Sequence, residues 1–213
     1  MTIPRYGLIS ETEARQIEAG ATVELERGGH VTPLAWDTLR AKRVTVVPAG
    51  SVDPSLPADL APAAEITRIA VGADHSGWKL KSALIDRLRK RGLAVRDCGT
   101  NSDEAVDYPD TALAVARAVV RGEADAGIVI DGSGLGSAIA ANKVRGIRAA
   151  MCTTPTLARY AREHNGANVL AIGASLIDPA AAAEIVDAWL ATPMREARYI
   201  RRLLKIRRIE ESS

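Results

Sequence analysis

The sequence has 213 residues, a formal net charge of +2, 47% hydrophobic residues and 25% charged residues. These values are typical of a soluble globular protein, and so small a net charge argues against nucleic acid as a partner. No apolar run approaches the roughly 18 residues of a membrane span. The first residues also lack the basic-then-apolar order of a signal peptide. We therefore expect a cytoplasmic protein that binds neither nucleic acid nor membrane.

Aromatic residues make up only 3% of the chain and phenylalanine is absent. The core must therefore consist of Ala, Val, Leu and Ile, a composition that suits a parallel sheet covered by helices. The two cysteines, Cys98 and Cys152, have no spacing typical of a metal site and need no disulfide. We interpret them as small buried residues or reduced thiols.

Residues 1–50 form a small N-terminal module. A helix is predicted to begin at Ser10, because a glutamate three residues later completes a capping box. Residues 21–26 and 43–50 are predicted strands. Fifty residues make a marginal core, so this module is expected to pack on something else. Residues 51–65, rich in Pro and Ala, are predicted to be an extended linker.

Residues 66–213 alternate between predicted strands and helices. Short apolar runs that end near Gly, Thr or Asp predict five strands, at 68–73, 93–99, 126–132, 147–153 and 168–174. Residues 79–91 and 110–122 have helical periodicity. In the first of these, Lys79, Lys81, Arg87 and Arg89 are expected to face outward. The alternation predicts an α/β domain with a doubly wound parallel sheet and helices on both faces, which binds its ligands beyond the carboxyl ends of the strands.

Polar residues suited to chemistry lie at the ends of two of these strands. Asp74 and His75 follow the first strand, where an acid–imidazole pair can orient a sugar hydroxyl or move a proton; alternatively, Asp74 only caps the next helix. Asp131 closes the third strand. The sequence "DGSGLGS" that it begins fits neither the dinucleotide fingerprint nor the P-loop. It predicts a loop of backbone N–H groups suited to an anionic oxygen, or simply a tight turn.

Two further groups are ambiguous on their own. His164 and Asn165 lie between a predicted helix and the last strand, where a helix-terminal histidine and a turn asparagine are common. In the tail, Arg195, Arg198, Arg202 and Lys205 share one helical face. Such faces are usually only solvated, but arginines also bind phosphate through two parallel hydrogen bonds.

Taken together, the motifs are more specific. The order "GADHSG", "DYPD", "DGSGLGSAIAANKVRGIRA" and "EHNGANVLAIG" closely resembles the ribose-5-phosphate isomerase B family, which also contains galactose-6-phosphate isomerase subunits. The resemblance covers about residues 67–209. It implies a Rossmann-like α/β fold, a homodimer or homotetramer, and interconversion of aldose and ketose phosphates with no metal and no organic cofactor.

The resemblance also implies roles for individual residues. Asp74 and His75 bind the sugar and assist ring opening, and His164 is the ring-opening acid or base. The other implied contacts to the substrate are Tyr108 at the pocket wall, Asn165 at the sugar, Arg198 and Arg202 at the phosphate, and Gly132, Ser133, Gly134 and Gly136 around the oxygen of the enediolate. The family builds this site across a subunit interface.

The chain departs from the family at three places. Many members have, at the position of Asp131, a cysteine that is the proton-transferring base, and another subgroup has a glutamate at the position of Ser137. With neither present, Asp131 is predicted to be the base. Relatives often carry an arginine where this chain has Ser175. The N-terminal module is not needed by the family core, and its resemblance to segments of some bacterial microcompartment-associated proteins implies assembly or encapsulation.

We therefore expect a sugar-phosphate isomerase, with ribose 5-phosphate as substrate and a cis-enediolate intermediate. The alternatives are an isomerase of a tetrose or hexose phosphate, of the galactose-6-phosphate type, and a non-catalytic sugar-phosphate-binding cargo subunit. Because every predicted site residue lies at or beyond Asp74, a chain that begins near Glu65 is expected to keep most of its kcat.

Overall fold

The computed structural model describes residues 3–49, 60, 62–63, 65–194 and 197–212. They fall into two compact units, one within residues 1–58 and 195–201 and the other within residues 59–194 and 202–213. Most of the predicted linker lies outside the described residues, as do Arg195 and the side chain of Arg198.

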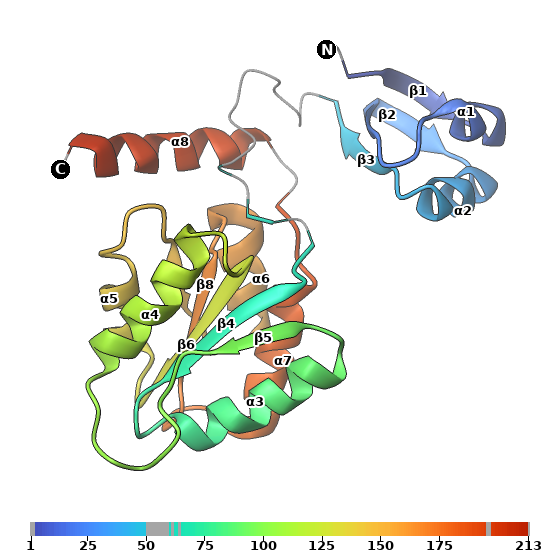
Figure 1. Ribbon diagram of the computed structural model, residues 1–213. Helices are drawn as coiled ribbons and strands as arrows, with labels where there is room; N and C mark the ends of the chain where they lie inside the picture. Colours follow the sequence, from blue (N-terminus) through green and yellow to red (C-terminus); the bar gives the residue numbers. More distant parts are fainter. Residues whose placement is uncertain (1–2, 50–59, 61, 64, 195–196, 213) are drawn as a thin grey trace. The chain divides into compact units, whose positions relative to one another are not determined.

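The first unit is a three-stranded parallel sheet with two helices (Figure 1). Its elements are β1 (Arg5–Ile9), α1 (Glu11–Gln16), β2 (Thr22–Val31), α2 (Pro33–Ala41) and β3 (Thr45–Pro48), and the strand order is β1-β2-β3. The structure confirms the helix after Ser10 and both predicted strands. It adds β1 and α2, which the sequence analysis did not predict.

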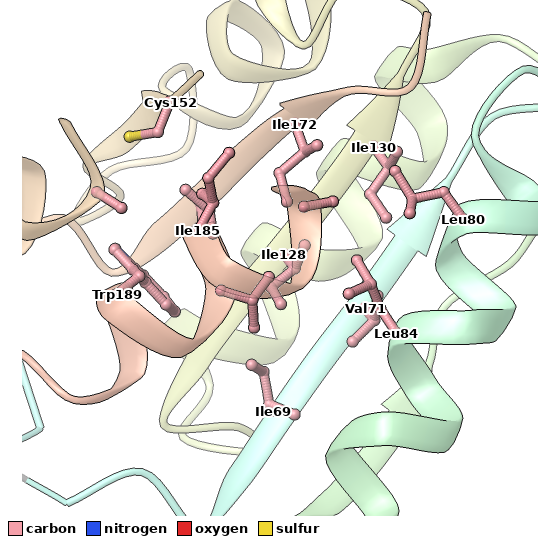
Figure 2. Packing of buried hydrophobic residues seen from close by; sticks show 14 of the residues in the cluster. Ile69, Val71, Leu80, Leu84, Ile128, Ile130, Cys152, Ile172, Ile185 and Trp189 are labelled. Carbon is pink, nitrogen blue, oxygen red and sulfur yellow. The ribbon is translucent and has the colours of Figure 1, made fainter. Parts of the chain in front are cut away.

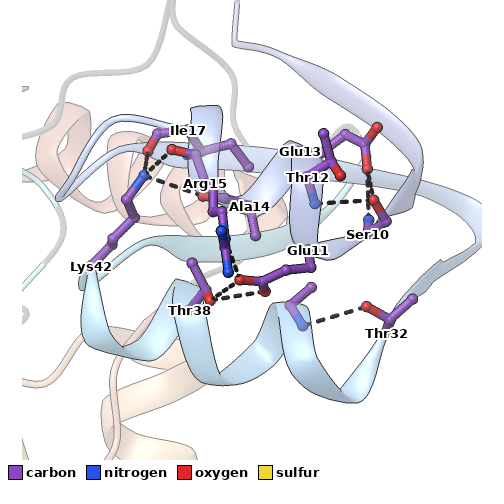
Figure 3. Close-up of polar contacts among 11 residues, drawn as sticks. Ser10, Glu11, Thr12, Glu13, Ala14, Arg15, Ile17, Thr32, Thr38 and Lys42 are labelled. Carbon is purple, nitrogen blue, oxygen red and sulfur yellow. Dashed lines mark hydrogen bonds and ion pairs between the residues drawn. The ribbon is translucent and has the colours of Figure 1, made fainter.

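Figure 3 shows the polar contacts that hold the two helices of this unit. The Ser10 N–H donates to Glu13 Oε2 at 2.9 Å and the Thr12 N–H donates to Ser10 Oγ at 3.2 Å, which satisfies N–H groups that the start of α1 leaves unpaired. Thr38 of α2 donates to the Glu11 carboxylate at 2.9 Å. The unit buries a small apolar core of its own, formed by Ile9, Ala14, Ile17, Val23, Val31, Ala35 and Leu39.

The second unit is built on a five-stranded parallel sheet with the order β5-β4-β6-β8-β7. Its strands are β4 (Arg68–Ala73), β5 (Ala94–Asp97), β6 (Ala126–Asp131), β7 (Ala149–Met151) and β8 (Val169–Gly173). Its helices are α3 (Trp78–Lys90), α4 (Tyr108–Val120), α5 (Leu135–Ala141), α6 (Pro155–Asn165), α7 (Pro179–Leu190) and α8 (Ala197–Ser212), of which only the part from Arg202 onward belongs to this unit. The predicted doubly wound α/β fold is confirmed.

Two apolar layers sandwich this sheet. On one face, residues of α3, α6 and α7 pack on alternate residues of β4, β6 and β8, and Figure 2 shows part of this layer around Ile128 and Ile185. On the other face, α4 and α5 cover the sheet through small residues such as Ala112, Val115 and Ala138. Ala and Val therefore fill the space that aromatic side chains fill in many cores, as the composition predicted.

The order of the strands reverses between β4 and β6. From β4 the chain crosses to β5 on one side, and the later strands are added on the other side, next to β6. In open parallel sheets ligands bind at such a switch point, beyond the carboxyl ends of the strands. Asp74 directly follows β4 and Asp131 is the last residue of β6, so both carboxylates lie at this point.

One expectation for α3 is wrong. Lys81 does not face outward: it is fully buried, and its ammonium group donates to Asp97 and to Asn101 Oδ1. Lys81 precedes the buried residues Leu84, Ile85 and Leu88 by three, four and seven positions. Lys81 therefore lies on the apolar face that the helical period identifies. The prediction placed it outward because its side chain is charged.

Candidate active site

Asp74 and Asp131 have the same local geometry on neighbouring strands. Asp74 is 6% exposed, and its Oδ1 accepts hydrogen bonds from the Ser76 and Gly77 N–H groups at 2.9 and 3.1 Å and from Ser76 Oγ at 2.6 Å. Each carboxylate thus satisfies backbone N–H groups of the turn that follows its strand. Asp74 bonds the turn and the N-cap residue Gly77 before α3, and no described side chain caps the N–H groups within the first turn of that helix.

Asp131 uses both carboxylate oxygens. Oδ1 accepts from the Ser133 N–H at 2.8 Å and from the Gly134 N–H, and Oδ2 accepts from the Ser137 N–H at 2.7 Å. Burial raises the pKa of Asp131, but the hydrogen bonds from Ser137, Gly134 and Ser133 outweigh it, so this pKa lies below its ordinary value. Asp131 is therefore an ionised carboxylate, 3% exposed, that organises the glycine loop.

The glycine loop is shaped by close backbone contacts. Gly134 has a φ of +79°, and a Cβ there would lie 3.0 Å from the backbone of β8. A Cβ at Gly136 would lie 2.6 Å from the ring of Tyr108, so this ring lies against the loop. Gly132 is open, with Ser76 Oγ and Ser175 Oγ 3.5 and 3.7 Å from where its Cβ would be. Two serine hydroxyls therefore flank this part of the loop, and one of them belongs to Ser175, where relatives often carry an arginine.

The loop differs from the predicted cradle of free N–H groups. The N–H groups of Ser133, Gly134 and Ser137 donate to Asp131, and that of Leu135 donates to Ser133 Oγ at 3.2 Å. Their hydrogen bonds are already made within the loop. Of the loop residues predicted to hold an oxygen, Ser133 and Gly134 therefore donate their backbone N–H groups to Asp131 instead.

His75 and Tyr108 extend the same edge of the sheet. His75 Nδ1 lies 3.3 Å from the carbonyl oxygen of Val106 and 3.4 Å from its amide nitrogen, which ties His75 to the segment before α4. Tyr108, the first residue of α4, is 40% exposed. The structure thus brings Asp74, His75, Tyr108 and the glycine loop together, as the sequence analysis predicted.

His164 and Asn165 do not join them within one chain. They end α6, just before β8, whereas Asp131 is paired in register with Gly173 at the far end of β8. The four residue steps from Val169 to Gly173 span roughly 13 Å. His164 stacks on the Tyr160 ring at 4.8 Å between centroids, and Asn165 Nδ2 donates to the Tyr160 carbonyl at 3.2 Å. These residues lie at the amino edge of the sheet.

Arg202 belongs to the same amino edge. Its neighbour Leu203 is buried, and a Cβ at Gly166 would lie 2.6 Å from Leu203 Cδ1, so this part of α8 packs beside the turn that follows Asn165. Arg202 itself is exposed. Arg202 and the predicted ring-opening residue His164 therefore share one edge, opposite that of Asp131.

The described thiols and carboxylates can hold a metal ion only where several of them cluster. Within the described part of the chain, no three His, Cys, Asp or Glu side chains cluster as metal ligands would. Burial raises the pKa of Cys98, and that of Cys152 to about 11, so neither thiol is a ready thiolate. Likewise, none of the described helices is both long and apolar enough to span a bilayer.

Residues 69–206 match the family model described as ribose/galactose isomerase. The chain belongs to this family. It is 46% identical to ribose-5-phosphate isomerase B of Escherichia coli over 144 residues, which cover 68% of this chain and 97% of that protein. A putative sugar phosphate isomerase of Rickettsia bellii is 44% identical over 138 residues, 65% of this chain and 96% of that protein.

Solved structures agree with this assignment. Ribose-5-phosphate isomerase B of Clostridium thermocellum superposes with a TM-score of 0.67 at 51% identity, over 68% of this chain and 98% of that one. The enzyme of Mycoplasma genitalium, solved with bound ribulose 5-phosphate, has a TM-score of 0.66 at 36% identity and covers 68% of this chain and 97% of its own. Nearly the whole length of these isomerases thus corresponds to about two thirds of this chain.

The sequence analysis missed three cations that this isomerase unit withdraws from water: Lys81, Arg148 and Arg162. Lys81 is fully buried, Arg162 is 1% exposed and Arg148 is half-buried. For Lys81 the helical period was an available signal. For Arg148 and Arg162 the sequence held no such signal, because the carbonyl groups of Leu60 and Ala63 that they bond are distant in sequence.

Gly173→Ala is expected to displace the glycine loop of the isomerase site. The added Cβ would lie 2.5 Å from the carbonyl oxygen of Ser133 and 2.6 Å from its carbon, and backbone atoms cannot swing aside as a side chain does. We expect a loss of about 1–3 kcal/mol of stability, as for other overpacked sites, together with loss of turnover. Thermal unfolding measures the first effect. The control is Gly132→Ala, whose Cβ makes only ordinary contacts; equal melting temperatures for the two variants would contradict the prediction.

Proposed function

We propose that this protein interconverts ribose 5-phosphate and ribulose 5-phosphate. The observation that carries the proposal is the convergence of Asp74, His75, Tyr108 and the glycine loop at the switch point of the sheet, in a chain 46% identical to a ribose-5-phosphate isomerase B. Purified protein incubated with ribose 5-phosphate should produce the ketose. No turnover by the intact chain would contradict the proposal.

The proposed reaction follows the chemistry of an aldose–ketose isomerase. His164, with Asn165 at the same end of the sugar, opens the ring. Asp131 then removes the proton from C2, and negative charge develops on the C1 oxygen of the enediolate. The proton of the C2 hydroxyl passes to that oxygen and Asp131 returns its proton to C1, which leaves the carbonyl group at C2. Gly132, Gly136 and the Ser133 hydroxyl are the contacts for the developing oxyanion, a type of contact that supplies a large part of catalysis in many enzymes.

We infer that the complete site is formed by two copies of this chain. His164, Asn165 and Arg202 lie at the amino edge of the sheet and Asp131 at the carboxyl edge, so one chain cannot apply both groups to one small sugar. Apolar side chains on α5 and α6 are available for a contact between copies: Leu135, Ile139, Leu157 and Tyr160 are 46–63% exposed.

A mixing experiment tests this arrangement. Asp131→Asn and His164→Asn chains, each inactive alone, are unfolded together and refolded. With sites shared between subunits of a dimer, random pairing restores about one quarter of the wild-type sites. Activity that stays at the level of the separate variants would contradict the shared site, while size-exclusion chromatography reports the oligomeric state.

Arg198→Ala and Arg202→Ala are expected to weaken phosphate binding. The two residues are four positions apart on α8, so they lie on the same face of the helix. Loss of hydrogen bonds to a charged group costs about 1.5–3 kcal/mol, which should raise KM roughly tenfold to 150-fold. Arg208→Ala, also exposed on α8, is the control. An unchanged KM in both variants would indicate a solvated face only.

The capped geometry of Asp131 favours one alternative, a sugar-phosphate-binding subunit without catalysis. Comparing turnover of four-, five- and six-carbon sugar phosphates with their binding by calorimetry distinguishes this alternative and also a tetrose- or hexose-phosphate isomerase. Binding without turnover of any of them would support the non-catalytic alternative. For residues 1–50, which lie outside the family match, a role in assembly or encapsulation stays a prediction.

A further inference from the structure

Two arginines of the isomerase unit have no part in the proposed reaction, although both are withdrawn from water. Half-buried Arg148 precedes β7, and buried Arg162 is in the last turn of α6. The Arg162 guanidinium is stacked on the ring of Trp189, 4.9 Å from its centroid, and Trp189 lies in the apolar layer shown in Figure 2. Within the part of the chain that the structure describes, neither guanidinium has a carboxylate in direct contact. A cation removed from water without an ion pair requires other acceptors.

Both guanidinium groups bridge the same two segments. Arg148 donates to the carbonyl oxygen of Gly166 at 2.8 Å and to that of Leu60 at 3.2 Å. Arg162 donates to the carbonyl oxygen of Ala167 at 2.8 Å and to that of Ala63 at 2.7 Å. Each arginine therefore joins the turn between α6 and β8 to the segment 60–63, about a hundred residues earlier in the chain.

The two guanidinium groups have few acceptors to spare. Burial, with the nearby charge of Arg148, lowers the pKa of Arg162 to about 10, so it stays charged at neutral pH and each N–H needs an acceptor. Among the described residues, Arg162 Nε already lacks a hydrogen-bond partner. Leu60 is itself buried, at 4% exposure, which holds its carbonyl in place. Losing Leu60 and Ala63 would remove one fixed acceptor from each guanidinium group, and water would take its place.

The turn that the arginines hold carries the predicted ring-opening residues. His164 and Asn165 directly precede Gly166, which ends α6 with a φ of 57°. Arg148 reinforces the same turn through its backbone, because its N–H donates to Asn168 Oδ1 at 2.8 Å. The segment 60–63, the two guanidinium groups and the His164–Asn165 pair thus form one connected set.

We propose that Arg148 and Arg162 are positioning residues that couple segment 60–63 to the His164–Asn165 turn. Segment 60–63 is then a working part of the isomerase unit and not a passive linker. This inference rests on the proposed function, because it assigns the turn to substrate. It also moves the boundary at which the chain can be shortened: a chain beginning at Glu65 lacks both carbonyls, whereas one beginning at Ser55 keeps them.

The first test uses the full chain. Arg162→Lys and Arg148→Lys keep the charge but lose the planar group that reaches two carbonyls. We expect faster amide hydrogen exchange confined to residues 164–168. We also expect kcat/KM for ribose 5-phosphate to fall roughly tenfold, which is less than the roughly 100-fold loss caused by a 1 Å misplacement of a reacting group. The control is Arg159→Lys, which is exposed on the same helix. A purely structural role would lower the melting temperature without changing kcat/KM well below it.

The second test leaves both arginines intact. Relatives match this chain over 97–98% of their own length but over only 68% of its length, so shortened chains are a fair comparison. The chain beginning at Ser55 is expected to match the full chain, and the chain beginning at Glu65 to reproduce the exchange and kcat/KM changes of Arg162→Lys. Wild-type exchange and kcat/KM in the lysine variants and in the Glu65 chain would overturn the coupling. If the full chain shows no turnover, the proposed function is overturned instead. The hydrogen-exchange measurement would then still show whether segment 60–63 and the His164–Asn165 turn are coupled.

Discussion

Asp131→Asn is expected to lower kcat at least ~100-fold, the lower end of the contribution of a positioned general base. The amide keeps the size of the carboxylate but cannot accept the proton from C2. Steady-state kinetics with ribose 5-phosphate measures the loss. If kcat stays near normal, Asp131 only caps the glycine loop and the base is another group.

The asparagine variant needs a matched control, because both oxygens of Asp131 accept hydrogen bonds. Its amide nitrogen would face an N–H donor, either that of Ser137 or those of Ser133 and Gly134. Asp131→Cys restores the residue that many family members carry there. It is expected to be active with a different pH dependence, whereas a variant that has merely lost the loop would be inactive at every pH.

The pH dependence follows from the lowered pKa of Asp131. A base must be deprotonated, so wild-type kcat/KM should stay level as the pH falls to about 4, the ordinary pKa of Asp, and decrease only below it. In the Asp131→Cys variant the activity should rise with pH toward about 8.5, the ordinary pKa of a thiol. The same carboxylate stabilises the folded state above its unfolded pKa, and this stability is lost as the pH falls through the folded value. Identical profiles for wild type and Asp131→Cys would contradict the assignment.

Asp97→Ala is expected to destabilise the isomerase unit by about 3 kcal/mol, the lower end of the 3–5 kcal/mol for breaking a buried ion pair. The variant leaves the fully buried ammonium group of Lys81 with Asn101 as its remaining acceptor. We choose the lower end because the Asp97 side chain is 32% exposed. Urea unfolding with a two-state fit to the transition of this unit measures the change in the free energy of unfolding.

The control for this prediction is the double variant Lys81→Met with Asp97→Ala, which removes the buried charge as well as its partner. It should recover much of the lost stability, because an apolar side chain needs no acceptor. The effect also extends toward the site: the carbonyl of Gly99 and the N–H of Thr100 bond to Ala73, directly before Asp74. A loss below about 1 kcal/mol for Asp97→Ala, as for an exposed pair, would contradict the prediction.

The sequence by itself determined the architecture of the isomerase unit and one half of its candidate site. Five apolar runs separated by helical segments specify a parallel sheet, and Asp74 and Asp131 lie at the carboxyl ends of two of its strands. Parallel strands bring their carboxyl ends to one edge, so residues at those ends gather there whatever the details of packing. The period of two or 3.6 residues and the position of a strand end are both local properties of a chain.

Only the tertiary structure decided where the other half of the candidate site lies and which charged side chains are buried. His164 also borders a strand, but it precedes β8 where Asp131 ends β6, and the register of those strands puts the two residues at opposite edges. Arg148 and Arg162 look like any surface arginine in the sequence, because their acceptors at Leu60 and Ala63 lie about a hundred residues away. Burial of a cation depends on which distant carbonyls the fold brings within hydrogen-bond reach, and a local pattern carries no information about them.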